Sequence, residues 1–116
     1  MATQLLSGLA PEYIKLDIDS DKDNQTEYNI RPLNGMQYAQ VVAQCVFKDG
    51  YLCVTEDAIP LIIQFGLLGW KNMLDGEGNE VDFDRALVNN IPGTDLFALA
   101  RKIFTKSTLA ESEKKT

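Results

Sequence analysis

The chain contains no histidine, and only two cysteines and one tryptophan occur among its 116 residues. Without histidine there is no Ser–His or Cys–His nucleophile and no ordinary general base for neutral pH. A structural zinc ion takes four ligands from cysteine and histidine, so two cysteines argue against one. Carboxylates are paired at Asp17 with Asp19 and at Asp82 with Asp84, but polar turns lack the dry pocket that a catalytic carboxylic acid needs. The sequence predicts a protein that is not an enzyme and uses no metal or cofactor.

Basic side chains are outnumbered, since eleven lysines and arginines accompany seventeen aspartates and glutamates and leave a formal net charge of −6. Such a surface repels phosphate groups, which disfavours nucleic acid and anionic membranes as partners. The apolar run at 58–70 is shorter than the roughly 20 residues of a membrane-spanning helix, and Pro60 and Gly66 interrupt it. The N-terminus has no positively charged region, and 5–10 is too short for the apolar core of a signal peptide. We therefore expect a cytoplasmic protein.

The two cysteines, Cys45 and Cys53, are close together in the sequence. Free cysteine is among the residue types that are most often buried, and the cytoplasm is a reducing environment. Two buried thiols are therefore the favoured interpretation, although the spacing alone leaves a disulfide open.

The length corresponds to one domain. We expect a flexible leader at 1–10, a single domain over 11–109 and a flexible tail at 110–116. Near the start of the domain, alternating apolar and polar residues predict strands over 13–18 and 27–33. The charged connector between them reads as a turn, so the two strands are expected to form a β-hairpin.

The segment 35–48 is predicted to be the first helix, because apolar residues recur there at helical spacing. Asn34 is placed to be its N-cap, and Gln37 can return the hydrogen bond as in a capping box. Gly50 can supply the left-handed conformation that ends a helix. The residues after this glycine, 51–54, are expected to be extended.

Three more helices are expected in the rest of the chain. The next begins at Thr55 or Asp57, and we favour the later start because Pro60 is tolerated only in a first turn. Another covers about 83–91 and must stop before the proline that follows it. The last begins at Thr94 as its cap. The predicted fold class is α+β and mainly α-helical, an N-terminal β-hairpin followed by about four helices in one compact domain.

An acidic segment resembles a calcium-binding loop at first sight. Asp75, Glu77 and Asn79 stand at positions one, three and five of an EF-hand. That loop needs glycine at position six and glutamate at position twelve, where this chain has Glu80 and Ala86. The segment is therefore interpreted as a solvated turn rather than a calcium site.

The apolar run at 58–70 surrounds its predicted helix on every side, with Gln64 as the strongly polar exception. A helix of this kind is either the centre of a core or shared with a partner. The core interpretation is favoured because apolar residues are usually inside, and an exposed stripe for self-association or client binding is the alternative. The candidate partner-binding residues on the stripe are Ile59, Ile62, Phe65, Leu68 and Trp70.

One short pattern resembles a known protein family. Gly69-Trp70-Lys71-Asn72, then Asp75 to Gly78 and Phe83, resemble the Gly-Trp-x-Asn, Asp-x-x-Gly, Phe signature of tail assembly chaperones from long-tailed, siphophage-type bacteriophages. Two further stretches, 29–38 and 87–111, are similar to the entry and to the C-terminal third of such proteins.

The resemblance implies a function without catalysis. Such chaperones bind the tape measure protein in the cytoplasm of the infected host, help recruit tail tube subunits around it, and are absent from the mature virion. Self-association, an acidic soluble exterior and a frameshifted longer form also fit the family. The alternative is a small structural neck or tail-completion protein, which is retained in the virion.

Overall fold

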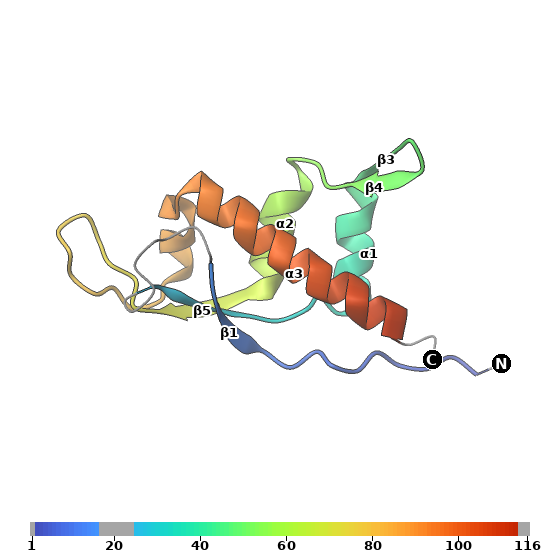
Figure 1. The fold of residues 1–116 in the computed structure, drawn as a ribbon, viewed down its shortest axis with the longest axis horizontal. Coiled ribbons are helices and arrows are strands. Elements are labelled where there is room, and N and C mark those ends of the chain that lie inside the picture. The colour runs from blue at the N-terminus through green and yellow to red at the C-terminus, as the bar shows by residue number, and fades with distance from the viewer. Residues whose placement is uncertain (1, 17–24, 114–116) are drawn as a thin grey trace.

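The computed structural model of the protein describes residues 2–16 and 25–113. Asp17 and Asp19, most of the predicted connector after them and the last three residues of the predicted tail lie outside this range. The described elements form an elongated domain of 56 × 28 × 26 Å, in which one long helix lies across two shorter ones (Figure 1).

A three-stranded antiparallel sheet lies along one side of this domain. Strands β1 (Glu12–Lys15) and β2 (Glu27–Ile30) pair antiparallel, which confirms the predicted hairpin strands, although both are shorter than expected. A third strand, β5 (Leu67–Lys71), pairs with the other edge of β2, so the order is β1-β2-β5. In this register Tyr28 stands opposite Trp70.

Helix α1 (Gly35–Ala43) begins at the predicted cap. The Asn34 side chain accepts a hydrogen bond from the backbone of Gln37 at 2.8 Å, and the Gln37 side chain accepts one from the backbone of Asn34 at 3.1 Å. The helix ends at Ala43 rather than at 48, because the next residues form a second, two-stranded sheet of β3 (Val46–Lys48) and β4 (Tyr51–Cys53).

The turn between β3 and β4 explains why the predicted first helix was too long. Asp49 has a φ of 53° and Gly50 a φ of 83°. Two central residues with positive φ are what a tight, type I′-like hairpin requires, and Asp-Gly is a favoured pair for it. Gly50 therefore has the left-handed conformation expected of it, but it closes a hairpin instead of ending a helix.

Helix α2 (Ala58–Gly66) begins directly after Asp57, which confirms the later of the two predicted starts and places Pro60 in the first turn. The helix does not extend through the apolar run to Trp70. Leu67 is extended, with φ −92° and ψ 115°, and the residues from there on join the sheet as β5. The edge of β2 supplies hydrogen-bond partners for the backbone, and a short apolar run fits a buried strand as well as a helix.

The last third of the chain contains one short and one long helix. In place of the predicted helix at 83–91 the structure has a 3-10 helix, η1 (Arg85–Asn90), whose first turn is capped by Asp84 through its bond to the Ala86 backbone at 3.0 Å. Helix α3 (Gly93–Glu113) starts one residue before the predicted cap, Thr94, and continues beyond 109.

The prediction of a mainly helical fold is therefore wrong. Within 2–16 and 25–113 the chain has three α-helices and five strands in two sheets, together with the short 3-10 helix. Two segments expected to be the ends of helices are strands instead, because each finds a pairing partner: β4 for 46–48 and β2 for 67–71.

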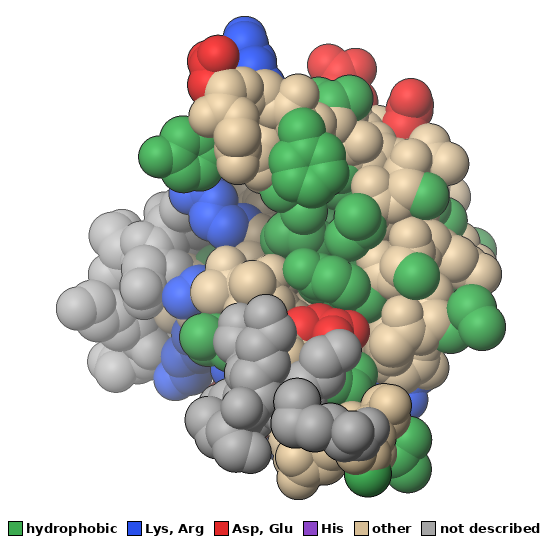
Figure 2. Space-filling view, turned by 90° about the vertical axis from the view of Figure 1, so that its right-hand side faces the viewer, with side chains coloured by type: hydrophobic (Ala, Val, Ile, Leu, Met, Phe, Trp, Pro, Cys, Tyr) green, Lys and Arg blue, Asp and Glu red, His purple; other side chains and the backbone are tan. Residues whose placement is uncertain are grey.

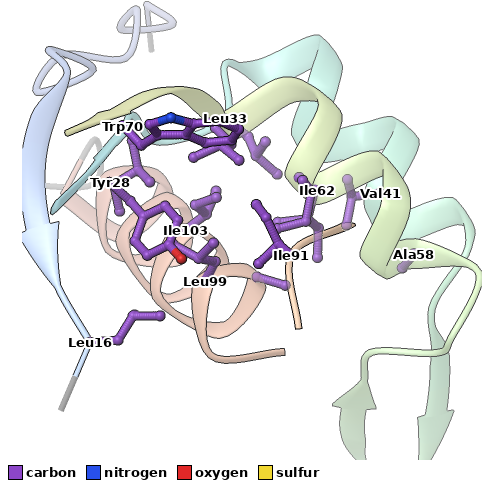
Figure 3. Close-up of a cluster of buried hydrophobic side chains, with 14 residues drawn as sticks. Leu16, Tyr28, Leu33, Val41, Ala58, Ile62, Trp70, Ile91, Leu99 and Ile103 are labelled. Carbon is purple, nitrogen blue, oxygen red and sulfur yellow. The ribbon is translucent and has the colours of Figure 1, made fainter. Parts of the chain in front are cut away.

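The core lies between the three-stranded sheet and helices α2 and α3 (Figure 3). The largest side chains that are fully buried there are Ile30, Leu33, Val41, Ile62, Leu67, Leu99 and Ile103. The second sheet, β3–β4, contributes no buried side chain to this cluster.

Candidate protein-binding surface

The five predicted partner-binding residues are not gathered on one surface. Ile62 is fully buried and Trp70 is 8% exposed, and both belong to the core cluster (Figure 3). Ile59, Phe65 and Leu68 are half-buried, the first two on α2 and the last on β5. Ile62 and Trp70 therefore belong to the core, and the other three residues of the stripe reach the surface in part.

The residues that carry the family resemblance hold a loop onto the sheet. The indole nitrogen of Trp70 donates to the carbonyl of Val81 at 2.9 Å, and the Phe83 ring meets the indole edge-on at 4.7 Å. Asn72 has a positive φ of 59°, and its carbonyl accepts a bond from the Thr26 hydroxyl at 2.9 Å. These contacts position the loop 72–83 against β5, which is a structural role.

The acidic part of this loop is a turn closed by its own side chain. One carboxylate oxygen of Asp75 accepts the backbone N–H groups of Glu77 and Asn79, both at 2.9 Å, and Gly78 has a φ of 85°. The side chain that would be the first calcium ligand is thus used for backbone hydrogen bonds. The described part of the chain contains no group of three or more side chains that could hold a metal ion.

Several of the most exposed apolar side chains of the described residues lie on the hairpin 46–54, which we call the exposed hairpin. They are divided between its two faces, since Phe47 stands opposite Leu52 and Tyr51 stands opposite Lys48. Phe47 is 74% exposed and Tyr51 75%, while Val46 and Val54 are 52% and 40% exposed. The hairpin projects from the end of α1 (Figure 1), and Figure 2, which looks at this end of the molecule, shows hydrophobic side chains gathered in a strip below the top of the view. A two-stranded hairpin without a covered face is marginally stable on its own in water, so this one is a candidate for contact with another chain.

A groove of about 380 Å³, the apolar groove, lies beside the exposed hairpin. One wall comes from the end of the hairpin and the first turn of α2, and the other from α3. Its lining residues are Val54, Glu56, Ile59, Phe97, Ala100, Arg101, Phe104 and Thr105. Ile59 is thus the predicted partner-binding residue that lines this groove. Phe97, on the opposite wall, is 56% exposed.

The α3 wall of the apolar groove is one face of a helix, and two of its side chains are packed against the fold. Ala100 and Arg101 lie three and four residues after Phe97, and Phe104 lies four and three residues after them, so the four residues share one face of the helix. Ala100 is buried, and the Phe104 ring stacks on Tyr38 of α1 with centroids 5.6 Å apart and planes at 12°. A surface with a fixed shape loses little conformational entropy when a partner binds.

The two cysteines, Cys45 and Cys53, are free thiols at the base of the exposed hairpin, and both are half-buried rather than buried as predicted. Burial raises the pKa of the Cys45 thiol, the backbone of Thr55 works against that rise, and Cys53 adds to it. A raised pKa keeps the sulfur protonated at neutral pH, and the thiolate is the nucleophilic form. Cys45 therefore has the character of a packing residue.

The chain was compared with protein families, curated proteins and solved structures. No protein-family model, curated protein or solved structure matches the chain. In the part of the chain that the structure describes, none of the helices has the length and apolar character needed to cross a membrane.

The sequence interpretation missed the exposed hairpin, and of the residues that line the apolar groove it named Ile59 alone. The signal for the exposed hairpin was present, since Asp49-Gly50 stands between Val46-Phe47-Lys48 and Tyr51-Leu52-Cys53. An Asp-Gly pair flanked by apolar residues is among the strongest local indications of a hairpin. The apolar groove has no comparable signal, because it depends on how α2 and α3 cross.

Proposed function

We propose that this chain is a tail assembly chaperone of a long-tailed bacteriophage. It binds the tape measure protein in the cytoplasm of the infected bacterium, helps recruit tail tube subunits, and is not retained in the mature virion. It carries out this role without catalysis or a cofactor. The resemblance of 69–83 to the family signature supports the proposal, and so do the similar stretches 29–38 and 87–111.

The observation that carries the proposal is the pairing of the exposed hairpin with the apolar groove. Phe47 and Tyr51 are large aromatic residues, a type that is enriched at protein–protein interfaces. A chaperone for a long, aggregation-prone helical client needs an apolar surface to offer and a charged exterior to stay in solution. The net charge of −6 supplies that exterior.

Self-association belongs to the same proposal. Within the described residues β3 pairs only with β4, so each of the two strands has one unpaired edge. Unpaired edges with exposed aromatic side chains favour pairing with another strand, and a second copy of the hairpin offers the same edge and the same side chains.

The test is co-expression with the protein encoded by the very long, helical reading frame expected downstream of this gene. A chaperone raises the soluble fraction of that protein and co-purifies with it, and mass spectrometry of purified particles does not detect the chaperone. Stoichiometric recovery of the chain from particles would instead establish the alternative, a neck or tail-completion protein. A Phe47→Asp variant should lose co-purification while keeping its circular dichroism, because Phe47 is 74% exposed.

A further inference from the structure

The apolar groove carries two charged side chains that form no ion pair within 2–16 and 25–113. Glu56 lies on the wall formed by the hairpin and α2, and Arg101 lies on the wall formed by α3. Neither takes part in an ion pair with another described residue, although Lys106 and Glu12 elsewhere on the surface do. One wall of the groove therefore carries a single acidic side chain and the other a single basic side chain, among lining residues that are mostly apolar.

The shape of the groove suits a helix better than a strand. Most of its lining residues belong to α2 and α3, whose backbone groups are already bonded within the helices. A strand docked there would gain no backbone hydrogen bonds from those walls. From Phe97 to Phe104 the α3 wall extends about 10 Å along its axis, which is two helical turns and matches anchors at i, i+3 or i+4, and i+7 of a partner.

We infer that the apolar groove binds one amphipathic helix of a client protein, with acidic residues on one flank of the apolar face and basic residues on the other. The inference rests on the proposed function, since it takes the helix to belong to a client. The acidic flank pairs with Arg101, the basic flank pairs with Glu56, and the apolar face covers Phe97 and Ile59. Reversing the direction of the helix exchanges its flanks, so the charge pattern also sets the direction of docking.

A second copy of this chain does not supply such a helix. Helices α1 (Gly35–Ala43) and α2 (Ala58–Gly66) contain no charged residue. On α3 the charged residues between Phe97 and Thr105, the stretch that lines the groove, are both basic, Arg101 and Lys102, and the acidic residues of this helix lie nearer its ends. Charge complementarity therefore favours a different protein as the occupant of the groove.

Three synthetic helices of 18 residues test the inference. All share one leucine face, and they differ in their flanks: one has a glutamate row and a lysine row, one has two glutamate rows, and one has two lysine rows. Fluorescence anisotropy with the full chain at physiological salt gives the three dissociation constants. Because an exposed ion pair changes affinity about twofold to fivefold, we expect the mixed helix to bind roughly threefold to tenfold more tightly than either of the others.

Reversing the charge of Glu56 or Arg101 on the protein should then change the order of affinity of the three helices. Glu56→Lys makes both walls basic and should make the all-acidic flanks the tightest, and Arg101→Glu should do the same for the all-basic flanks. Glu77→Lys changes the net charge as Glu56→Lys does but lies in the loop closed by Asp75, so it should leave the order unchanged. An order that is the same in all four proteins, or no binding of any probe, overturns the inference.

A matched pair of apolar substitutions separates the groove from the rest of α3. Phe97 and Leu109 are both 56% exposed on α3, but only Phe97 lines the groove. Phe97→Asp should abolish probe binding and Leu109→Asp should not. If Phe97→Asp instead dissolves a dimer that sedimentation velocity detects in the wild type, while no probe binds, the groove belongs to a second copy and the inference is wrong.

Failure of the inference is distinguishable from failure of the proposed function. If the tape measure protein co-purifies equally with the wild type, Phe97→Asp and Glu56→Lys, the function stands and the groove is not its site. If the probes follow the predicted order while the tape measure protein is never recovered, the groove binds helices and the proposed client is wrong.

Discussion

Buried polar side chains in the described part of this domain form hydrogen bonds, and the bond made by Tyr28 affects how the stability of the fold depends on pH. The described part of the chain has no buried side-chain nitrogen or oxygen without a hydrogen bond. The Tyr28 hydroxyl donates to a carboxylate oxygen of Asp95 at 3.4 Å, which ties β2 to the first turn of α3. Burial raises the pKa of Tyr28 well above its usual value of 10.0, and the charge of Asp95 and this hydrogen bond raise it further.

The raised pKa predicts a loss of stability in alkali. Above about pH 10 the Tyr28 hydroxyl loses its proton in the unfolded chain but keeps it in the folded chain, so the folded state binds one more proton at this residue. This group then lowers the free energy of unfolding by about 1.4 kcal/mol per pH unit. A Tyr28→Phe variant lacks this dependence. Urea titrations from pH 8 to 11 should therefore show the free energy of unfolding of the wild type falling relative to that of the variant as the pH rises. A difference that stays constant over this range would contradict the prediction.

Ser107 is a fully buried hydroxyl with two bonds. It donates to the carbonyl of Ile103 at 2.7 Å and accepts the backbone N–H of Leu33 at 2.8 Å. Ser107→Ala leaves that N–H buried without a partner, which should cost about 1–3 kcal/mol in urea unfolding. Thr108→Ala is the control, since Thr108 makes the same kind of bond back to Phe104 but is exposed. Equal effects of the two substitutions would show that water replaces Ser107 without loss.

Elements of secondary structure were predictable where a local signal decided them. Asn34 and Gln37 identified the start of α1 because a capping box is made by residues only three positions apart. The strands β1 and β2 were predictable from their alternation, which one covered face of a sheet imposes. β5 was not predictable in this way. Its residues are apolar on both faces, and what makes it a strand is the distant edge of β2.

The crossing of α2 and α3 depends on one glycine at the end of α2. A Cβ atom built on Gly66 would lie 2.5 Å from one methyl carbon of Ile103 and 2.8 Å from another. Gly66→Ala therefore forces the two helices apart and should destabilise the fold by about 1–3 kcal/mol in thermal or urea unfolding. Gly76→Ala is a matched control, because nothing lies within 4 Å of its Cβ position.

The Gly66 prediction has an internal test. Ile103→Ala removes the atoms that the new methyl group would meet, so Gly66→Ala should cost much less in that background than in the wild type. The two substitutions are then strongly non-additive, as expected of side chains in direct contact. Additive effects would mean that the alanine is accommodated by another movement, and that this contact does not set the spacing of α2 and α3.

At the scale of the whole molecule, the candidate surface could be anticipated only in part. Ile59 was among the predicted partner-binding residues and lines the apolar groove, but its partners there come from α3, far along the chain. Ile62 and Trp70 shared the same apolar stripe and are core, since α3 and the sheet cover them. Hydrophobicity along a sequence indicates how much surface will be buried, and the topology decides which residues remain outside.

The net charge of the molecule opposes self-association and its exposed apolar surface favours it, and the two effects are distinguished by their dependence on salt concentration. Copies with a net charge of −6 repel one another, whereas the exposed hairpin attracts a second hairpin. Raising the ionic strength from about 0.01 M to about 1 M shortens the screening length from roughly 30 Å to roughly 3 Å and leaves apolar contacts intact. Sedimentation velocity should therefore show the wild type shifting from monomer toward larger species as salt is added.

Two variants assign that shift to the exposed hairpin. Phe47→Asp should stay monomeric at every salt concentration, because it places a charge where the apolar contact forms. Leu74→Asp adds the same charge at a side chain that is 59% exposed, in the loop that projects at the opposite end of the molecule (Figure 1), and should associate like the wild type. Association that weakens as salt rises would mean that ion pairs hold the copies together. The exposed hairpin would then be left free for the client protein.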